Sequence, residues 1–186
     1  MQWLKTSDAD FEKKFARVVA DRRESGGDVA KTVYSILGDV RSSGDEALAE
    51  YTERYDDFTL PESGDWRIDP DRCRAAFDAL DADLRETLEL AEQRIRAYHE
   101  AQLPENRDYT DDAGVRLGAK WTAVDAAGLY VPGGRAAYPS SLLMNAIPAK
   151  VAGVERLVIA TPTPRGEINE LVLAAAHLAG VDEIWP

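Results

Sequence analysis

The stretch of this sequence with the clearest capacity for ligand chemistry is Gly128-Leu-Tyr-Val-Pro-Gly-Gly134. Glycines in a turn let the backbone approach a ligand closely, and the amide groups at the start of a following helix face an anion. The stretch contains neither G-x-G-x-x-G nor G-x-x-x-x-G-K-[ST], since no lysine follows its glycines. On topology alone, residues 132–141 are equally well interpreted as a ligand-binding loop or as a plain strand-to-helix turn.

Two side chains near this turn have alternative interpretations. Tyr130 either contacts a cofactor or closes the edge of a sheet with its ring, and the residue pattern alone favours the second role. Asn145 either presents its amide to the loop or bonds within a packed layer, and the sequence leaves both open.

Other residues of catalytic type form no obvious site. Ser140 and Ser141 lack a G-x-S-x-G context, so helix capping is the better interpretation. His99 and His177 belong to no H-x-x-x-H or H-E-x-x-H pattern, which argues against a self-contained zinc site, and His177 is expected to pack. Cys73 is the only cysteine; it excludes an intrachain disulfide and is expected to be a buried thiol.

The elements around the turn follow a strand-helix-strand-helix-strand order. A short β-prone run ends at the proline and glycines, a helix opens at Pro139-Ser-Ser141, and a continuously apolar run follows it. We expect strands at 129–131, 157–160 and from 181, and helices at 139–153 and 169–179. This order predicts a parallel sheet of the doubly wound, nucleotide-binding kind, and the apolar run at 157–160 predicts a strand covered on both faces.

The first 110 residues read as mainly helical. Apolar residues at helical spacing predict helices at 8–23, with a capping box at its start, 28–43, from 45, 70–80 and 81–103, with Ser25-Gly-Gly27 breaking the first from the second. Two short strands are expected around Gly118. We therefore divide the chain into a mainly helical region, 1–110, and the first part of a sheet domain, 111–186.

Charge and hydropathy exclude several classes of partner. The net charge is −12, most of it in the helical region. A positive field is needed to bind phosphate polymers, so nucleic acid and anionic membranes are not expected partners. No stretch approaches the roughly 20 apolar residues of a membrane span, and the first residues lack the order of a signal peptide, so a cytoplasmic location is expected.

The segment GLYVPGGRAAYPSSLLMNAIPAKVAGVE, residues 128–155, is followed by the apolar run and Thr161-Pro-Thr-Pro164. This long segment closely resembles the histidinol dehydrogenase family. Shorter upstream pieces are also similar to that family, among them Asp39-Val-Arg41, Tyr98-His99 and Gly114-Val-Arg-Leu-Gly118. The resemblance implies a Rossmann-like sheet of the aldehyde dehydrogenase type, which lacks the usual glycine fingerprint.

The family resemblance also implies an activity. Its members oxidise L-histidinol through histidinal to L-histidine with two hydride transfers to NAD, the last step of histidine biosynthesis, and act as homodimers. Tyr130 matches the tyrosine that contacts NAD, with Pro132 and Gly133 shaping the same wall.

Zinc holds the substrate in the family, and a glutamate and a histidine handle protons. These ligands and the acid-base pair are expected in segments that would follow Pro186, so we expect neither catalytic nor metal residues in this chain and no activity from it alone. The alternative is a non-catalytic nucleotide-binding or interaction module with the same fold.

Overall fold

A computed structural model describes residues 3–62, 64–133 and 138–186, and for residues 21–28 it describes the backbone alone. The chain forms two compact units, Met1–Tyr51 and Thr52–Pro186. The expected division at residues 110 and 111 concerns where the nucleotide-binding domain begins, and it stays a prediction.

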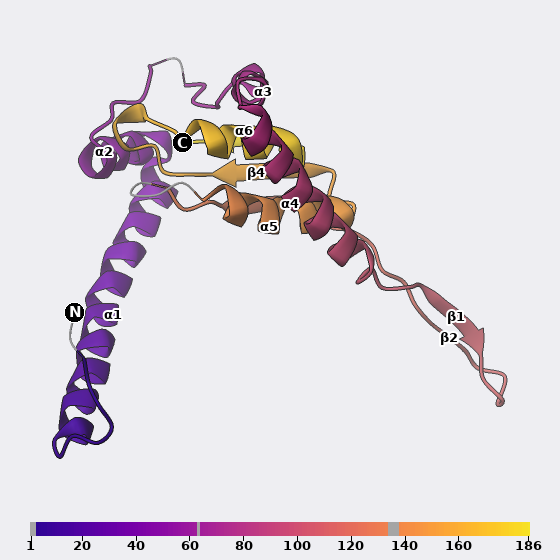
Figure 1. Ribbon diagram of the computed structural model, residues 1–186, viewed down its shortest axis with the longest axis horizontal. Helices are drawn as coiled ribbons and strands as arrows, with labels where there is room; N and C mark the ends of the chain where they lie inside the picture. The colour runs from indigo at the N-terminus through magenta and orange to yellow at the C-terminus, as the bar shows by residue number, and fades with distance from the viewer. Residues whose placement is uncertain (1–2, 63, 134–137) are drawn as a thin grey trace. The chain divides into compact units, whose positions relative to one another are not determined.

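The first unit is built on one long helix. Helix α1 spans Phe11–Ser43, and α2, Asp45–Asp56, follows it across the boundary of the unit (Figure 1). The expected break at Ser25-Gly-Gly27 is wrong, because glycine costs a helix only about 1 kcal/mol relative to alanine and keeps its N–H donor. The expected end is confirmed: Gly44 follows the helix with φ of 57° and donates to the carbonyl of Val40.

In the second unit, two helices each begin directly after an aspartate whose side chain caps them. Helix α3 spans Pro70–Asp78, and Asp69 accepts a hydrogen bond from the amide of Asp71 at its start. Helix α4 spans Ala82–Glu100, and Asp81 accepts from the amide of Leu84. The expected capping box before α1 is wrong, because its N-cap, Asp10, makes no side-chain cap bond and pairs with Lys14 instead.

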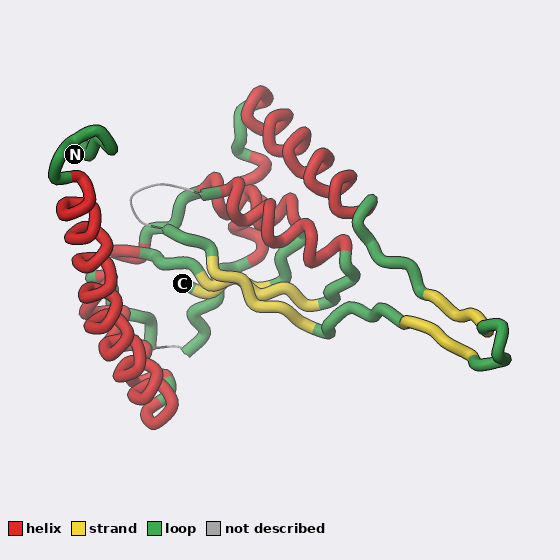
Figure 2. Tube along the Cα trace, turned by 90° about the horizontal axis from the view of Figure 1, so that it is seen from below, coloured by secondary structure: helices red, strands yellow, loops and turns green. Residues whose placement is uncertain are grey.

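A small antiparallel hairpin follows α4. Strands β1, Arg107–Thr110, and β2, Arg116–Ala119, lie side by side (Figure 2), with Arg107 opposite Ala119. One of the two strands expected around Gly118 is confirmed as β2. The strand that pairs with it is β1, which lies on the other side of the hairpin turn. The side chain of Asp108 accepts a hydrogen bond from Arg116 across the hairpin at 2.8 Å.

The expected parallel sheet is confirmed. It contains β3, Ala126–Tyr130, β4, Arg156–Ala160, and β5, Glu183–Trp185, in that spatial order. Helix α5, Pro139–Val151, connects the first two strands, and η1, Pro164–Gly166, with α6, Glu170–Ala179, connects the last two. Leu129 lies opposite Ile159, and Ile159 lies opposite Ile184.

Both connecting helices lie on one face of this sheet. Connections between parallel strands are nearly always right-handed, so two successive crossovers in one direction place both helices on the same side. Figure 2 shows α5 and α6 on one side of the strands, and α3 and α4 pack in turn on α6 and α5. The core between these layers includes Leu142, Leu143, Ile147, Leu157, Ile159 and Leu173, each at most 1% exposed.

The expectation that residues 157–160 are covered on both faces is wrong for the part of the chain that the structure describes. In β4, Leu157 and Ile159 are buried under the helices, whereas Arg156 and Ala160 point to the opposite face and are exposed. On that face Arg156 pairs with Glu183 of β5 at 2.7 Å.

Candidate functional site

The carboxyl edge of the sheet brings together the loops that follow β3 and β4. Beyond β3, the amide of Val131 donates to the carbonyl of Ala160 at 2.9 Å. Beyond β4, the amide of Thr161 donates to the carbonyl of Trp185 at 3.0 Å. These bonds extend the sheet past its strands and fix where each loop begins. In open α/β sheets ligands bind at this edge.

Tyr130 is exposed at the end of β3. Side chains alternate along a strand, so Leu129 and Val131 point into the core while Tyr130 points to the open face. Its exposed fraction is 65%, whereas Val131 is fully buried. The partly buried Leu129 and the fully buried Val131 therefore anchor the backbone on either side of an exposed aromatic ring.

Gly133 lies close to the loop that follows β4. A Cβ atom placed on Gly133 would be 2.8 Å from the carbonyl oxygen of Pro162 and 3.5 Å from Oγ1 of Thr161. The φ angle of Gly133 is not in the left-handed region, so its backbone conformation does not require glycine. The lack of a side chain instead allows the two loops to approach each other closely. Pro132, beside it, is exposed. The rest of the turn, Gly134 to Ala137, lies outside the described residues.

The amino end of α5 follows the turn. Capping by Ser140 or Ser141 is wrong: the helix starts at Pro139, its N-cap is Tyr138, and no side chain caps it. Asn145 donates its side-chain amide to the carbonyl of Ser141 at 2.7 Å, so it bonds within its own helix. No acidic residue lies in the first turn, which leaves the positive end of the helix dipole uncompensated there.

Sequence reasoning assigned no role to Thr163, in the loop after β4. This residue is only 3% exposed, and its Oγ1 has no hydrogen-bond partner among the residues that the structure describes. Unpaired buried hydroxyls are uncommon because desolvation without a hydrogen bond costs about 1–3 kcal/mol. In the sequence, only the segment Thr161-Pro-Thr-Pro164 could have pointed to Thr163. That segment was part of the family resemblance but contains no recognisable catalytic or binding motif.

The opposite edge of the sheet carries a structural ion pair. Asp182 accepts hydrogen bonds from Lys150 Nζ at 2.8 Å and from the amide of Leu157 at 2.7 Å. Burial acts to raise the pKa of Asp182, but these two hydrogen bonds outweigh it and hold the pKa below its ordinary value. The charge therefore ties α5 and β4 to the start of β5.

Cys73 is buried, whereas His177 is exposed and His99 is half-buried, each with its ring beside an aromatic ring. Burial raises the pKa of the Cys73 thiol, as expected for a packing cysteine. The ring of His177 lies 5.5 Å from that of Phe77, and the ring of His99 lies 5.2 Å from that of Tyr98. Within the described ranges, no three His, Cys, Asp or Glu side chains are placed to hold a metal ion.

The parallel sheet with a glycine-bearing loop at its carboxyl edge defines an α/β protein with a Rossmann-like sheet. The model of the histidinol dehydrogenase family matches residues 19–186, and the chain belongs to this family. It is 57% identical to the histidinol dehydrogenase of Rhodospirillum rubrum and 54% identical to that of Zymomonas mobilis, each over 182 residues. These alignments cover 98% of this chain and 42% of each relative.

Solved structures agree with the family assignment. The crystal structure of histidinol dehydrogenase from Elizabethkingia anophelis matches with a TM-score of 0.77 at 28% identity, covering 84% of this chain and 36% of that one. The chain thus spans well under half the length of the relatives that it matches. In the described residues, no helix is long and apolar enough to cross a membrane.

Proposed function

We propose that this chain forms the amino-terminal part of an NAD-dependent histidinol dehydrogenase, which oxidises L-histidinol through histidinal to L-histidine. The observation that carries the proposal is the identity of more than half of the residues with histidinol dehydrogenases over nearly the whole chain. The described carboxyl edge supports it, because an exposed tyrosine and a glycine loop precede a helix whose amino end bears no acidic residue.

In this proposal Tyr130, Pro132 and Gly133 form one wall of the NAD site. The exposed ring of Tyr130 offers an apolar surface for stacking, and the exposed Pro132 limits where the cofactor can lie. The amides at the start of α5 face the diphosphate. NAD supplies the hydride acceptor, and these residues bind and orient it.

The zinc ion and the acid-base residues belong, in this proposal, to the part of the relatives that this chain does not span. A polypeptide of residues 1–186 alone is therefore expected to produce no NADH from L-histidinol, and measurable turnover by it would contradict this part. We also expect a cytoplasmic homodimer when the protein is complete, which light scattering of the purified protein tests.

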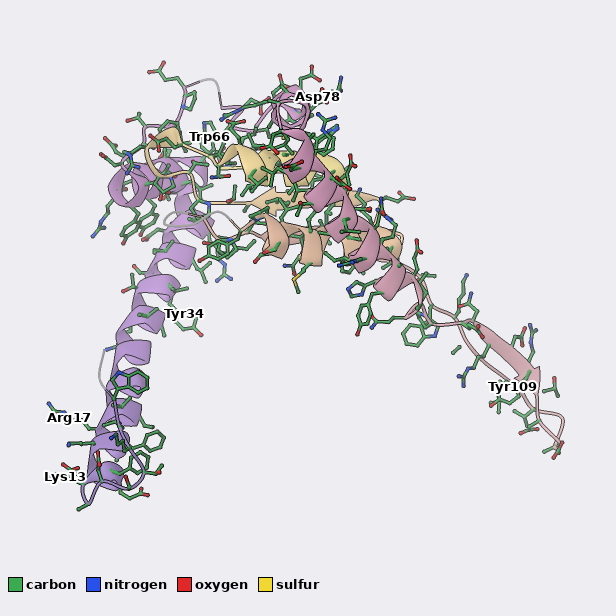
Figure 3. All side chains as sticks on the ribbon, in the orientation of Figure 1. Lys13, Arg17, Tyr34, Trp66, Asp78 and Tyr109 are labelled. Atoms are coloured by element: carbon green, nitrogen blue, oxygen red, sulfur yellow. The ribbon has the colours of Figure 1, made fainter. Side chains whose placement is uncertain are left out.

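The test uses the longest natural form of the protein. We expect histidinol-dependent NADH formation, measured at 340 nm, that zinc chelation abolishes. Tyr130→Ala is expected to raise the Kd for NAD about twofold to tenfold, because an aromatic contact contributes roughly 0.5–1.5 kcal/mol. Tyr109→Ala is the matched control, because Tyr109 is similarly exposed but lies on the β1–β2 hairpin (Figure 3). NAD binding without any histidinol oxidation would favour the non-catalytic nucleotide-binding module instead.

A further inference from the structure

A groove of about 540 Å³ runs between α4 and α5, which pack against each other in the second unit (Figure 1). This volume lies within the range of small-molecule sites, about 300–1,000 Å³. No strand residue and no residue of the loop after β4 lines it among the described residues, so it is separate from the proposed wall of Tyr130, Pro132 and Gly133. Its apolar lining comes from both helices and includes Leu88, Ala91, Ile95, Tyr98, Leu143 and Met144.

The apolar lining of the groove is open to solvent. On α4, Leu88, Ala91, Ile95 and Tyr98 follow one another at intervals of three or four residues, so they share one face of the helix. Tyr98 is 65% exposed, and Met144 of α5 is 63% exposed. Large apolar side chains gathered at an open groove indicate a binding surface, and the flexible thioether of methionine adapts to the shape of a ligand. The groove therefore offers a place for an apolar group.

The charge of the groove is opposite in sign to that of the chain. The chain carries 34 acidic and 22 basic side chains, yet Arg94 lines the groove and, among the described residues, no Asp or Glu does. The next arginine on α4, Arg96, pairs with Glu92 at 2.6 Å. Arg94 is exposed and makes no ion pair or side-chain hydrogen bond within the part of the chain that the structure describes. A guanidinium in this position can pair with a carboxylate through two parallel hydrogen bonds.

Two further polar side chains line the groove. His99 is half-buried with its ring beside that of Tyr98, and Ser140 is exposed at the start of α5. The imidazole and the hydroxyl can each donate a hydrogen bond. The first turn of α5 contains no acidic residue, so no carboxylate there repels an anion. The polar side chains of the groove thus favour an anion over a cation.

We propose that this groove binds a small apolar carboxylate, a molecule with one carboxylate group on an aliphatic chain or an aromatic ring. Arg94 pairs with the carboxylate, while the apolar face of α4 and the side chain of Met144 cover the apolar part. A neutral apolar molecule would leave Arg94 without a partner, and a small, highly charged anion would leave the apolar surface uncovered. The proposal does not depend on NAD binding at the edge of the sheet.

The experiment measures Kd values by isothermal titration calorimetry in the longest natural form of the protein. The probes are decanoate and 2-naphthoate, and each is compared with its neutral amide, decanamide or 2-naphthamide. We expect wild type to bind a carboxylate more tightly than the matching amide. The carboxylate that binds more tightly shows whether the groove takes an aliphatic chain or an aromatic ring.

Two substitutions separate the charged and apolar contributions. Arg94→Gln is expected to raise the Kd for the carboxylate about threefold to tenfold, the range for a lost charge-assisted hydrogen bond at an exposed site, and to leave the Kd for the amide unchanged. Met144→Ala is expected to raise both Kd values by about threefold, because it removes part of the apolar surface. Both side chains are exposed, so the melting temperature should stay near that of wild type.

Arg107→Gln is the matched control. Arg107 is also exposed and has no ion pair among the described residues, but it lies on β1, away from the lining of the groove. Equal weakening by Arg94→Gln and Arg107→Gln would contradict the proposal, as would equal Kd values for each carboxylate and its amide. Wild type that binds neither carboxylate at millimolar concentration would overturn it as well. None of these results bears on the proposed function, which is tested by histidinol-dependent NADH formation.

Discussion

Replacing Gly133 with alanine tests whether the loops after β3 and β4 are held together by close packing. The new Cβ atom would lie 2.8 Å from the backbone oxygen of Pro162, which cannot rotate away as a flexible side chain can. Real Cβ atoms do not approach this closely, so one loop must shift. Overpacking of this kind costs about 1–3 kcal/mol.

Gly128→Ala is the matched control for this substitution. Gly128 lies in β3, its φ is not in the left-handed region, and a Cβ atom there would meet nothing within 4 Å. Alanine at such a position stabilises a protein by about 0.4–1 kcal/mol, because it restricts the unfolded chain. The same unfolded-state gain applies at Gly133 and partly offsets the steric cost there.

The expected result is an opposite change in the two variants. Gly128→Ala should raise the free energy of unfolding by about 0.4–1 kcal/mol, and Gly133→Ala should lower it by up to about 2.5 kcal/mol after the same gain is subtracted. Urea denaturation followed by circular dichroism measures both values. An increase for Gly133→Ala equal to that of Gly128→Ala would refute the close approach of the two loops.

Three further predictions concern the scaffold. Leu173→Ala, at a fully buried position of α6, should lower the free energy of unfolding by about 2–5 kcal/mol in urea denaturation, whereas Leu90→Ala, 45% exposed on α4, should change it by at most about 0.5 kcal/mol. Gly38→Ala should stabilise α1 by about 1 kcal/mol, seen as a higher melting temperature, because a Cβ atom there meets nothing within 4 Å; a lower value would show a contact at that position. Asp182→Asn should cost about 1 kcal/mol at pH 7 and progressively less as the pH falls below 3.8: the folded pKa of Asp182 is lowered, so its contribution is present above the ordinary value of 3.8 and is lost as the pH falls through the folded value. A loss that stays the same as the pH falls would show that the charge of Asp182 is not the stabilising feature.

Local sequence signals predicted most of the helices of the second unit and the alternation of strands and helices in its parallel sheet. Asp69 before Pro70, Asp81 and Asn169 all cap helices in the structure as their residue types indicate. Gly153 and Gly180 follow the two helices beside the sheet with φ of 90° and 70°. These features depend on hydrogen bonds and backbone conformations within a few residues, so the sequence pattern contains them.

Local sequence signals gave wrong predictions where two alternative backbone conformations or positions differ little in free energy. The adjacent glycines Gly26 and Gly27 of α1 read as a break, but their cost in a helix is small and no proline accompanies them. Ser140 and Ser141 read as caps because of their residue type, yet both lie in the first turn of the helix, which begins at Pro139. Residue type cannot distinguish a cap from a first-turn residue, because serine is common at both places.

The sequence by itself indicated the family and the succession of strands and helices that builds a parallel sheet, since both are read from residue types and their spacing along the chain. Tertiary structure alone decided the strand order β3-β4-β5, which places both helices on one face, the contact of Gly133 with Pro162, and the burial of the Thr163 hydroxyl without a partner among the described residues. Each of these facts depends on contacts between segments about 30 or more residues apart in sequence or on the solvent exposure of a side chain. Such distances and exposures arise only when the chain packs, because no periodicity or residue type in the sequence records them.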